Sequence, residues 1–278
     1  MRWAIAGAAG LLLASCSSVP VQLPEGVTVS AYQGRFDRAE RQLELKVTNT
    51  TDATFTVTSA VLDSTRFVDE ARWDRPQDIP SGSARDLRVA LGAADCSDTP
   101  ALDEVVLDFV LPNGSGGSAR LTIVDASVID AINSEDCLAE AVAKVATIEP
   151  SDSLRWMPGA RLPATLDLTV TPTGAPGSIG ITESTATVLL SLVDDGGAPV
   201  FSLPQTVVVD ADSAPAVIPL RLIPARCDPH AVAEDKRGTI FPLQALTSDG
   251  DSGQVLVPVS DAIRAELYAF YADYCGLP

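Results

Sequence analysis

The sequence predicts a mainly β protein with two tandem β-sandwich domains that come from an internal duplication, each ending in a short α-helix. Short runs rich in valine, leucine and threonine alternate with turn signals along most of the chain, a pattern typical of all-β sandwiches. With 278 residues, the chain is long enough for two domains. Its second half also repeats the first with a period of about 135 residues, far longer than the ~20 to 50 residues of a solenoid unit.

The N-terminal segment predicts export and membrane attachment. One arginine, an apolar run and a few small residues lead to Cys16, and the run falls short of the ~20 apolar residues that a membrane-spanning helix needs. The letters LASC at 13–16 resemble the lipobox of bacterial lipoproteins. That resemblance implies a signal peptide over 1–15, cleavage before Cys16 and lipid attachment to this cysteine, whose acyl chains form the membrane anchor. An ordinary secretory signal is the alternative.

The rest of the chain divides into a tether and two domains. Residues 16–26 contain two prolines and no periodicity, so we expect an extended lipid-anchored tether of about 30 Å at ~3.3 Å per residue. We expect the first β-sandwich domain over 27–143, a linker over 144–160 and the second domain over 161–278. The folded part is therefore expected at the outer face of the cell membrane, outside the cytoplasm.

The duplication is clearest in a hairpin. VVLDFVLPNGSGGSARLTIVDA at 105–126 parallels IFPLQALTSDGDSGQVLVPVSDA at 240–262, and each copy places a turn glycine, Gly114 or Gly250, between two β-runs. Upstream, LELKVT from Leu43 parallels LDLTVT from Leu166. The parallel thus covers most of the chain after the tether and indicates domain duplication.

A helix is predicted after each hairpin, beginning at an Asp-Ala pair. In the second copy, apolar residues with helical spacing form one face, with Ser260 or Asp261 as the N-cap; they are Ile263, Leu267, Phe270, Tyr271 and Tyr274. The first copy is shorter and weaker, with inner residues Val128, Ile129 and Ile132. Both predicted helices end in a cysteine.

Four cysteines remain after Cys16, and they occupy matching positions in the two copies. In an exported chain this predicts two disulfides. Of the three possible connectivities, only Cys96 with Cys137 and Cys227 with Cys275 respects the duplication, each pair closing a loop within its own domain. Such loops are expected to stabilise the fold by ~3 to 4 kcal/mol each in the chain-entropy model.

The chain is strongly acidic, with 37 acidic against 19 basic residues and a net charge of -18. Both halves share the excess of acids, so it is a property of the whole surface. Such a surface repels phosphate backbones and makes nucleic acid a poor partner. Solubility is the ordinary explanation, and a basic protein partner or weak cation binding is the alternative.

The loop after Cys227 holds the weak candidate binding residues Asp228, His230, Glu234 and Asp235. His230 is the only histidine, and the segment from Cys227 to Gly250 spans 23 residues against 18 from Cys96 to Gly114. Extra loop length on a rigid scaffold is a common place for function. A solvated loop or a short helix without a functional role is the alternative.

No catalytic, cofactor-binding or metal-binding set stands out. A structural zinc site needs four ligands and a catalytic one usually three, whereas this chain has one histidine and cysteines expected to be oxidised. The paired aspartates lack the spacing of a calcium loop and are interpreted as turn residues. No serine elbow, phosphate loop or dinucleotide fingerprint is present. We therefore expect no enzyme activity, no cofactor and no metal.

Two tryptophans follow the tether. Trp73 and Trp156 each lie near arginine and proline, so each is a candidate exposed binding anchor. For Trp156, a packing role at the domain boundary is favoured because it follows the expected linker; for Trp73, neither interpretation is favoured.

In architecture, each domain resembles the immunoglobulin-like domains of bacterial envelope lipoproteins, although no tryptophan lies between the paired cysteines as in true immunoglobulin domains. The preference for arginine over lysine and the alanine-rich signal are similar to actinobacterial lipoproteins. These observations predict a non-enzymatic, lipid-anchored envelope protein that binds or scaffolds another envelope protein or a wall polymer. An extracytoplasmic protein that captures a small ligand or metal ion is the alternative, and a secreted hydrolase the third hypothesis.

Overall fold

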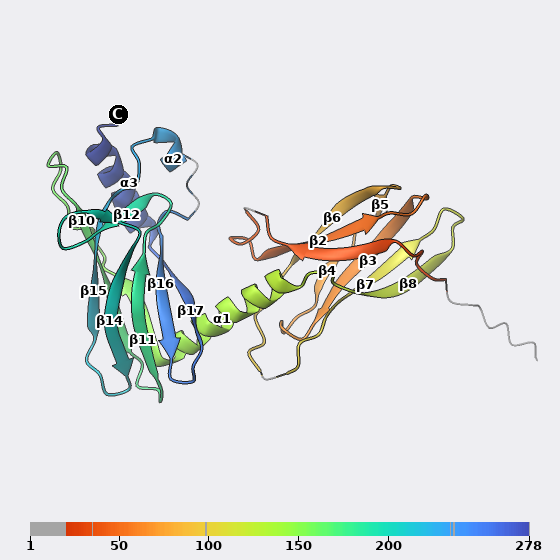
Figure 1. Cartoon of the computed structure of the whole chain (residues 1–278), viewed down its shortest axis with the longest axis horizontal. Coiled ribbons are helices and arrows are strands. Elements are labelled where there is room, and N and C mark those ends of the chain that lie inside the picture. Colours follow the sequence, from red (N-terminus) through yellow and green to blue (C-terminus); the bar gives the residue numbers. More distant parts are fainter. Residues whose placement is uncertain (1–20, 35, 98, 234, 236, 278) are drawn as a thin grey trace, which may run out of the picture. The chain divides into compact units, whose positions relative to one another are not determined.

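The chain is mainly β, as predicted, with several antiparallel sheets (Figure 1). The computed structural model describes residues 21–277 apart from 35, 98, 234 and 236. Cys16 and the signal segment lie outside the described residues. The described part forms two compact units: unit 1 contains 21–93 and 99–129, and unit 2 contains 94–97 and 130–277.

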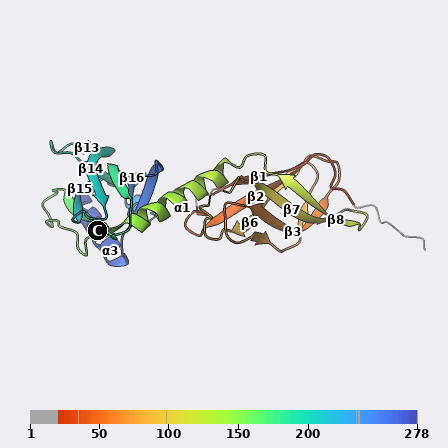
Figure 2. The same cartoon turned by 90° about the horizontal axis from the view of Figure 1, so that it is seen from below.

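Unit 1 is a two-sheet sandwich (Figure 1; Figure 2). Its strands are β1 (Val27–Tyr32), β2 (Gln42–Asn49), β3 (Phe55–Ser64), β4 (Ala71–Trp73), β5 (Gln77–Ile79), β6 (Ser83–Ala90), β7 (Asp103–Val110) and β8 (Gly116–Thr122). One sheet has the order β1-β2-β6; the other has the order β4-β3-β7-β8, with β5 also paired to β3. Alternation explains the layers: in β2, Leu43, Leu45 and Val47 are fully buried between the sheets, so their neighbours point to the outer face.

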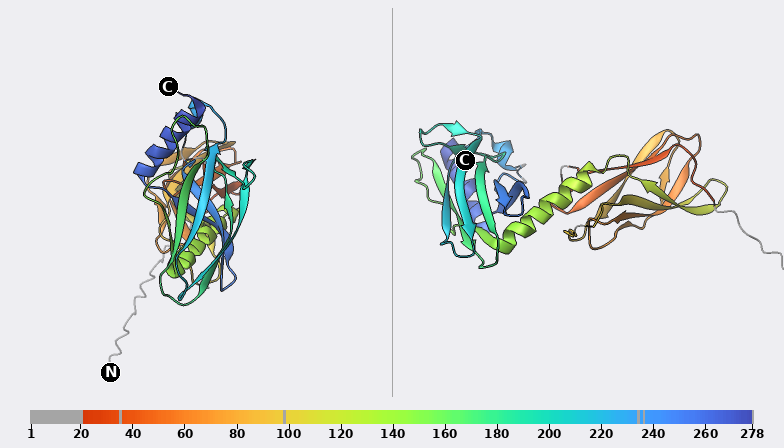
Figure 3. Two further views of the ribbon diagram at one scale, coloured as in Figure 1. Left: turned by 90° about the vertical axis from the view of Figure 1, so that its left-hand side faces the viewer. Right: turned by 60° about the horizontal axis from the view of Figure 1, so that its bottom comes forward.

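Unit 2 is also a two-sheet sandwich (Figure 1; Figure 3). Its strands are β9 (Ala146–Pro150), β10 (Ala164–Pro172), β11 (Ser178–Thr185), β12 (Leu190–Val193), β13 (Pro199–Val200), β14 (Ser202–Asp210), β15 (Ala216–Pro224), β16 (Ile240–Thr247) and β17 (Ser252–Pro258). The sheet orders are β13-β12-β15-β10-β9 and β14-β11-β16-β17. The helices are α1 (Ser127–Val145), which begins in unit 1, α2 (Pro229–Ala233) and α3 (Asp261–Cys275).

The predicted hairpins and C-terminal helix are confirmed. β7 pairs with β8 and β16 with β17, and the turn glycines Gly114 and Gly250 have φ of 81° and 97°, a left-handed conformation that glycine adopts at little cost. Ser260 caps α3 by accepting a hydrogen bond from the Ile263 N–H at 3.3 Å. The predicted apolar face is buried at Ile263, Leu267, Phe270 and Tyr271.

The first helix and the linker differ from the prediction. α1 has 19 residues, against 15 in α3, and is therefore not short. It continues because Leu138, Val142 and Val145 are buried in the core of unit 2. The expected linker over 144–160 instead contains the last residues of α1 and the strand β9, which pairs with β10. The first domain therefore does not extend to residue 143: most of α1 belongs to unit 2.

The disulfides join Cys96 with Cys137 and Cys227 with Cys275, the pairing expected from the repeat. The expectation that each pair lies in its own domain is wrong for the first pair. Residues 94–97, between β6 and β7 in sequence, group with unit 2 and carry Cys96 to α1. Within the described residues, no helix has both the length and the apolar character needed to span a membrane.

Candidate functional site

The predicted loop after Cys227 is held together by its own carboxylates. Asp228 Oδ1 accepts a hydrogen bond from the His230 N–H at 3.0 Å at the start of α2. The Tyr271 hydroxyl of α3 donates to the Arg226 carbonyl and accepts from the Asp228 N–H at 3.1 Å. His230 itself is exposed. These contacts position the backbone of the loop.

Asp235 has the same role at the end of the loop. Its Oδ1 accepts from the backbone N–H groups of Arg237 and Gly238 at 3.1 and 2.5 Å, and its Oδ2 accepts from the Tyr268 hydroxyl at 2.9 Å. Burial, and next this bond, raise the pKa of Tyr268 to about 12. Glu234 lies outside the described residues, and no group of metal-ligating side chains is assembled in the described part of the chain. The structure thus does not bring Asp228, His230 and Asp235 together into one site.

A stronger candidate lies on the outer face of the β1-β2-β6 sheet. Register places Tyr32 of β1 opposite Glu44 of β2, and Glu44 opposite Arg88 of β6. Directly paired residues point to the same face, so an aromatic, an acidic and a basic side chain form one row across three strands. Asp86 lies in the next row, because strand residues two positions apart share a face.

Glu44 and Arg88 form the centre of this row. The Arg88 Nε and Nη2 atoms lie 2.7 and 2.6 Å from Glu44 Oε1, and Nη2 lies 3.5 Å from Asp37 Oδ1. The Glu44 side chain is only 7% exposed, whereas that of Arg88 is 54% exposed. The hydrogen bond to Glu44 raises the pKa of Arg88. Burial, and next a hydrogen bond to the Asp86 carboxylate, raise the pKa of Tyr32 to about 12.

Trp73 lies beside this row, because β4 contacts β6. Its Nε1–H donates to the Arg75 carbonyl at 2.7 Å. The Arg75 guanidinium carbon lies 4.1 Å from the centroid of the indole ring, a cation–π geometry. Trp73 is half-buried and Arg75 is exposed.

These side chains line a shallow pocket of about 350 Å³, which we call the Trp73 pocket. Its lining residues are Glu44, Trp73, Arg75, Asp86 and Arg88. All of them belong to unit 1. The pocket thus combines an indole from β4, two guanidinium groups and two carboxylates; Glu44, Asp86 and Arg88 come from β2 and β6, and Arg75 follows β4.

Sequence reasoning identified only one member of the pocket, Trp73, and left its role open. Glu44 and Arg88 stand at alternate positions of two β-runs, where charged residues are normally solvated. Only the register, which pairs them across 44 positions of sequence, shows that they meet. The signal available in the sequence was Glu44 itself, a charged residue between the apolar neighbours Leu43 and Leu45.

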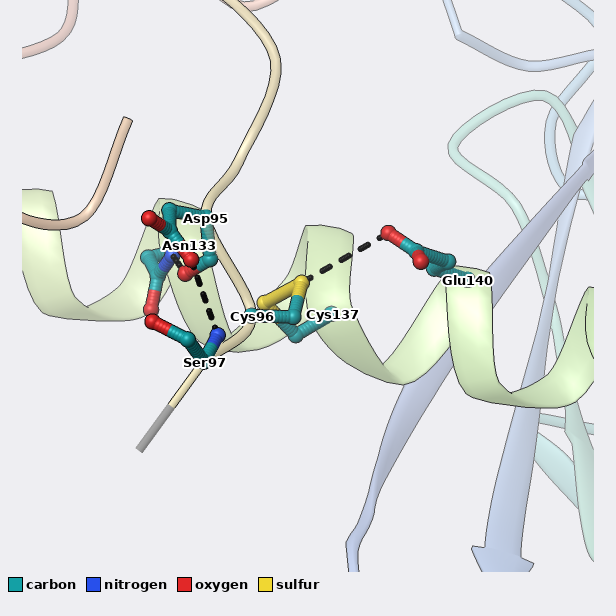
Figure 4. The surroundings of a disulfide bond; sticks show 6 residues. All are labelled: Asp95, Cys96, Ser97, Asn133, Cys137 and Glu140. Carbon is teal, nitrogen blue, oxygen red and sulfur yellow. Dashed lines mark hydrogen bonds between the residues drawn. A yellow bond between two sulfur atoms is a disulfide. The ribbon is translucent and has the colours of Figure 1, made fainter. Parts of the chain in front are cut away.

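A second pocket of about 400 Å³ lies in unit 2 beside the Cys96–Cys137 disulfide. Figure 4 shows Glu140 one turn along α1, with its Oε2 3.6 Å from the Cys96 Sγ; a disulfide sulfur has no proton to donate. Glu140, Lys144 and Asp249, the charged residues of the lining, are all exposed. Water already satisfies such groups, so they favour a ligand less than buried ones do.

The segment that carries Cys96 is firmly attached to α1. The Asn133 side-chain amide donates to the Asp95 carbonyl at 3.1 Å, and the Ser97 N–H donates to Asp95 Oδ1 at 2.9 Å (Figure 4). The Ser97 hydrogen bonds lower the pKa of Asp95. These contacts and the disulfide make this region a scaffold.

Comparisons with known proteins do not identify a family. No protein-family model matches the chain, and no curated protein matches it. Among solved structures, the B domain of a biofilm-associated protein is 7% identical, with a TM-score of 0.25 over 84% of this chain and 83% of that one. Red sea bream transglutaminase is 12% identical, with a TM-score of 0.22 over 86% of this chain but only 32% of the transglutaminase.

Proposed function

We propose that this protein is a lipid-anchored, extracytoplasmic binding or scaffolding protein without enzyme activity. It is held on the outer face of the cell membrane through Cys16 and binds an envelope protein or a wall polymer. Support for export comes from the lipobox-like LASC letters and from two disulfides, which persist in oxidising compartments.

The observation that carries the binding role is the Trp73 pocket. Tryptophan and arginine are enriched among the residues that dominate binding energy at protein interfaces. Here Trp73 and Arg88 are presented on the strands β4 and β6, and strands position a site more precisely than loops do. The partially buried Glu44–Arg88 pair adds directional polar groups beside the indole.

The binding role is tested by crosslinking on intact cells that express either the native chain or Trp73→Ala. We expect a reproducible crosslinked partner for the native chain and at least a ~10-fold loss for Trp73→Ala, the size of effect typical of a central aromatic anchor. Phe201→Ala is the matched control, because Phe201 is 75% exposed and lies in unit 2. A clean absence of partners, or equal loss in both variants, would contradict the proposal.

The anchor is tested separately with Cys16→Ala. We expect the native protein in the membrane fraction, with a lipid-modified N-terminal cysteine in its mass spectrum. The variant should lose this modification and leave the stable membrane-bound pool, since several acyl chains hold a protein far more strongly than a short apolar segment does. A native chain that is secreted without lipid would show an ordinary signal peptide instead.

A further inference from the structure

The Trp73 pocket contains a carboxylate oxygen, Glu44 Oε2, that has no protein partner and that solvent can reach, since no fully buried side-chain oxygen or nitrogen of the described residues lacks a hydrogen-bond partner. Both close Arg88 contacts reach the same oxygen of Glu44, Oε1. Within the part of the chain that the structure describes, Glu44 Oε2 accepts no hydrogen bond. The side chain is more than nine-tenths buried, yet it lines the pocket. A ligand that enters the pocket therefore meets an acceptor oxygen with an unused hydrogen-bonding capacity.

From this we infer that the Trp73 pocket binds a basic side chain, lysine or arginine, of a protein partner. The inference rests on the proposed function and names the chemistry that the site recognises. The cation would donate to Glu44 Oε2 and contact the Asp86 carboxylate beside the indole.

Burial decides between a cationic and an anionic ligand. An anion would have to use Arg75, which is exposed, and Arg88, whose side chain is 54% exposed. Water competes effectively for such guanidinium groups, and ion pairs at exposed positions add little. The Glu44 carboxylate is largely shielded from water, so an ion pair there is screened less. A donor cation therefore gains more in this pocket than an anion does.

Arg75 shows where a cation fits. Its guanidinium already lies 4.1 Å from the Trp73 centroid, so the chain fills the cation–π position with its own side chain. Because Arg75 is exposed, a basic group from a partner can replace it at low cost. The net charge of -18 also favours the approach of a basic partner over an acidic one.

The test uses the full chain with isotope-labelled tryptophan, in which each indole N–H gives one NMR signal. The full chain also contains Trp3, so Trp73→Phe and Trp156→Phe identify the two signals that are compared, and the Trp156 signal serves as the internal control. The probes are capped pentapeptides with a central lysine, arginine, glutamine or glutamate between glycines. We expect the lysine and arginine peptides to shift the Trp73 signal, and the glutamine and glutamate peptides to leave it unchanged at equal ionic strength.

Matched variants sharpen the result. Glu44→Gln should weaken binding of the basic peptides at least ~10-fold, because it removes one charge of a shielded pair. Asp167→Asn, the same strand position in unit 2, should leave binding unchanged. Arg75→Ala should strengthen binding about two- to fivefold by freeing the cation–π position. Since Arg75 is exposed, this variant keeps the test decisive even if Glu44→Gln does not fold.

Two outcomes would overturn the inference. One is a glutamate peptide that shifts the Trp73 signal as much as the lysine peptide does; the other is no shift with any peptide. If a crosslinked partner on cells still depends on Trp73 in either case, the proposed function stands and the partner is recognised by other chemistry. If the basic peptides bind but no partner is crosslinked, the cation site is real and the proposed function fails.

Discussion

The two units carry a carboxylate at the same place of the repeat, and they use it differently. Glu44 follows Leu43 as Asp167 follows Leu166. Arg155 binds both oxygens of Asp167, with its Nη1 next to Oδ2 and its Nη2 3.0 Å from Oδ1, and the Asp167 side chain is 22% exposed. Glu44 is 7% exposed, and only one of its oxygens is bound.

Register explains the difference. In unit 1, Arg88 stands directly opposite Glu44. In unit 2, Pro219 stands opposite Asp167, and the arginine of β15, Arg221, is paired with Thr165 and donates to the Asp194 carbonyl. The Asp167 carboxylate therefore takes its arginine from the segment before β10. A duplicated scaffold thus leaves an unused acceptor in one copy and saturates it in the other, which places the candidate site in unit 1.

The tryptophans of the two units also have different surroundings. Trp156 packs edge to face on Phe270 of α3, with centroids 5.7 Å apart, against the core of unit 2. Trp73 instead lines a pocket under an arginine. Trp156 therefore packs against the core of its unit, whereas Trp73 lines a surface pocket, where we propose that it binds a partner.

The largest expected effect concerns the disulfides, which test where unit 1 ends. The loops span 41 and 48 residues, so removal of either pair by double Cys→Ala substitution should cost about 3 to 4 kcal/mol. Because all four cysteines belong to unit 2, the loss should lower the urea midpoint reported by the Trp156 signal. The midpoint reported by Trp73 should stay unchanged.

The Cys227–Cys275 pair is the control for the Cys96–Cys137 pair. Loss of Cys227–Cys275 should act on unit 2 alone, whichever unit residues 94–97 stabilise. If loss of Cys96–Cys137 lowered mainly the Trp73 midpoint, the segment would stabilise unit 1. The Cys96–Cys137 disulfide would then stabilise the first domain, as the repeat predicts, although both of its cysteines are grouped with unit 2.

Much of the scaffold was accessible from the sequence because its signals are local. Alternating apolar residues and turn glycines predict the hairpins, and the spacing from Ile263 to Tyr271 predicts the buried face of α3. The cysteine pairing followed from the duplication. The extent of α1 did not, because Leu138, Val142 and Val145 are ordered by the core of unit 2, which no local signal describes.

The candidate site was less accessible. The weak prediction favoured His230 and its acidic neighbours because they lie in a loop that is longer than its counterpart in the first copy and that holds the only histidine, but Asp228 and Asp235 are used to hold the loop. In the Trp73 pocket, strand register brings Glu44 of β2 opposite Arg88 of β6, and Trp73 joins them because β4, a strand of the other sheet, contacts β6. Register decides whether such an ion pair forms. Arg88 stands opposite Glu44 in unit 1, whereas in unit 2 Pro219 stands opposite Asp167 and the arginine of β15, Arg221, lies two positions further along the strand.

A smaller effect tests the comparison of the two carboxylates directly. Arg88→Met should leave the buried carboxylates of Asp37 and Glu44 without their shared cation, and buried charges that lose a partner destabilise a fold. Arg155→Met leaves only the Asp167 carboxylate without its cation, and water can reach this carboxylate. The loss of stability should therefore be as small as that from removing a surface ion pair. We expect Arg88→Met to lower the urea midpoint at Trp73 clearly more than Arg155→Met lowers it at Trp156. Equal shifts would mean that Glu44 is as well solvated as Asp167, and the argument for a cation in the Trp73 pocket would lose its physical basis.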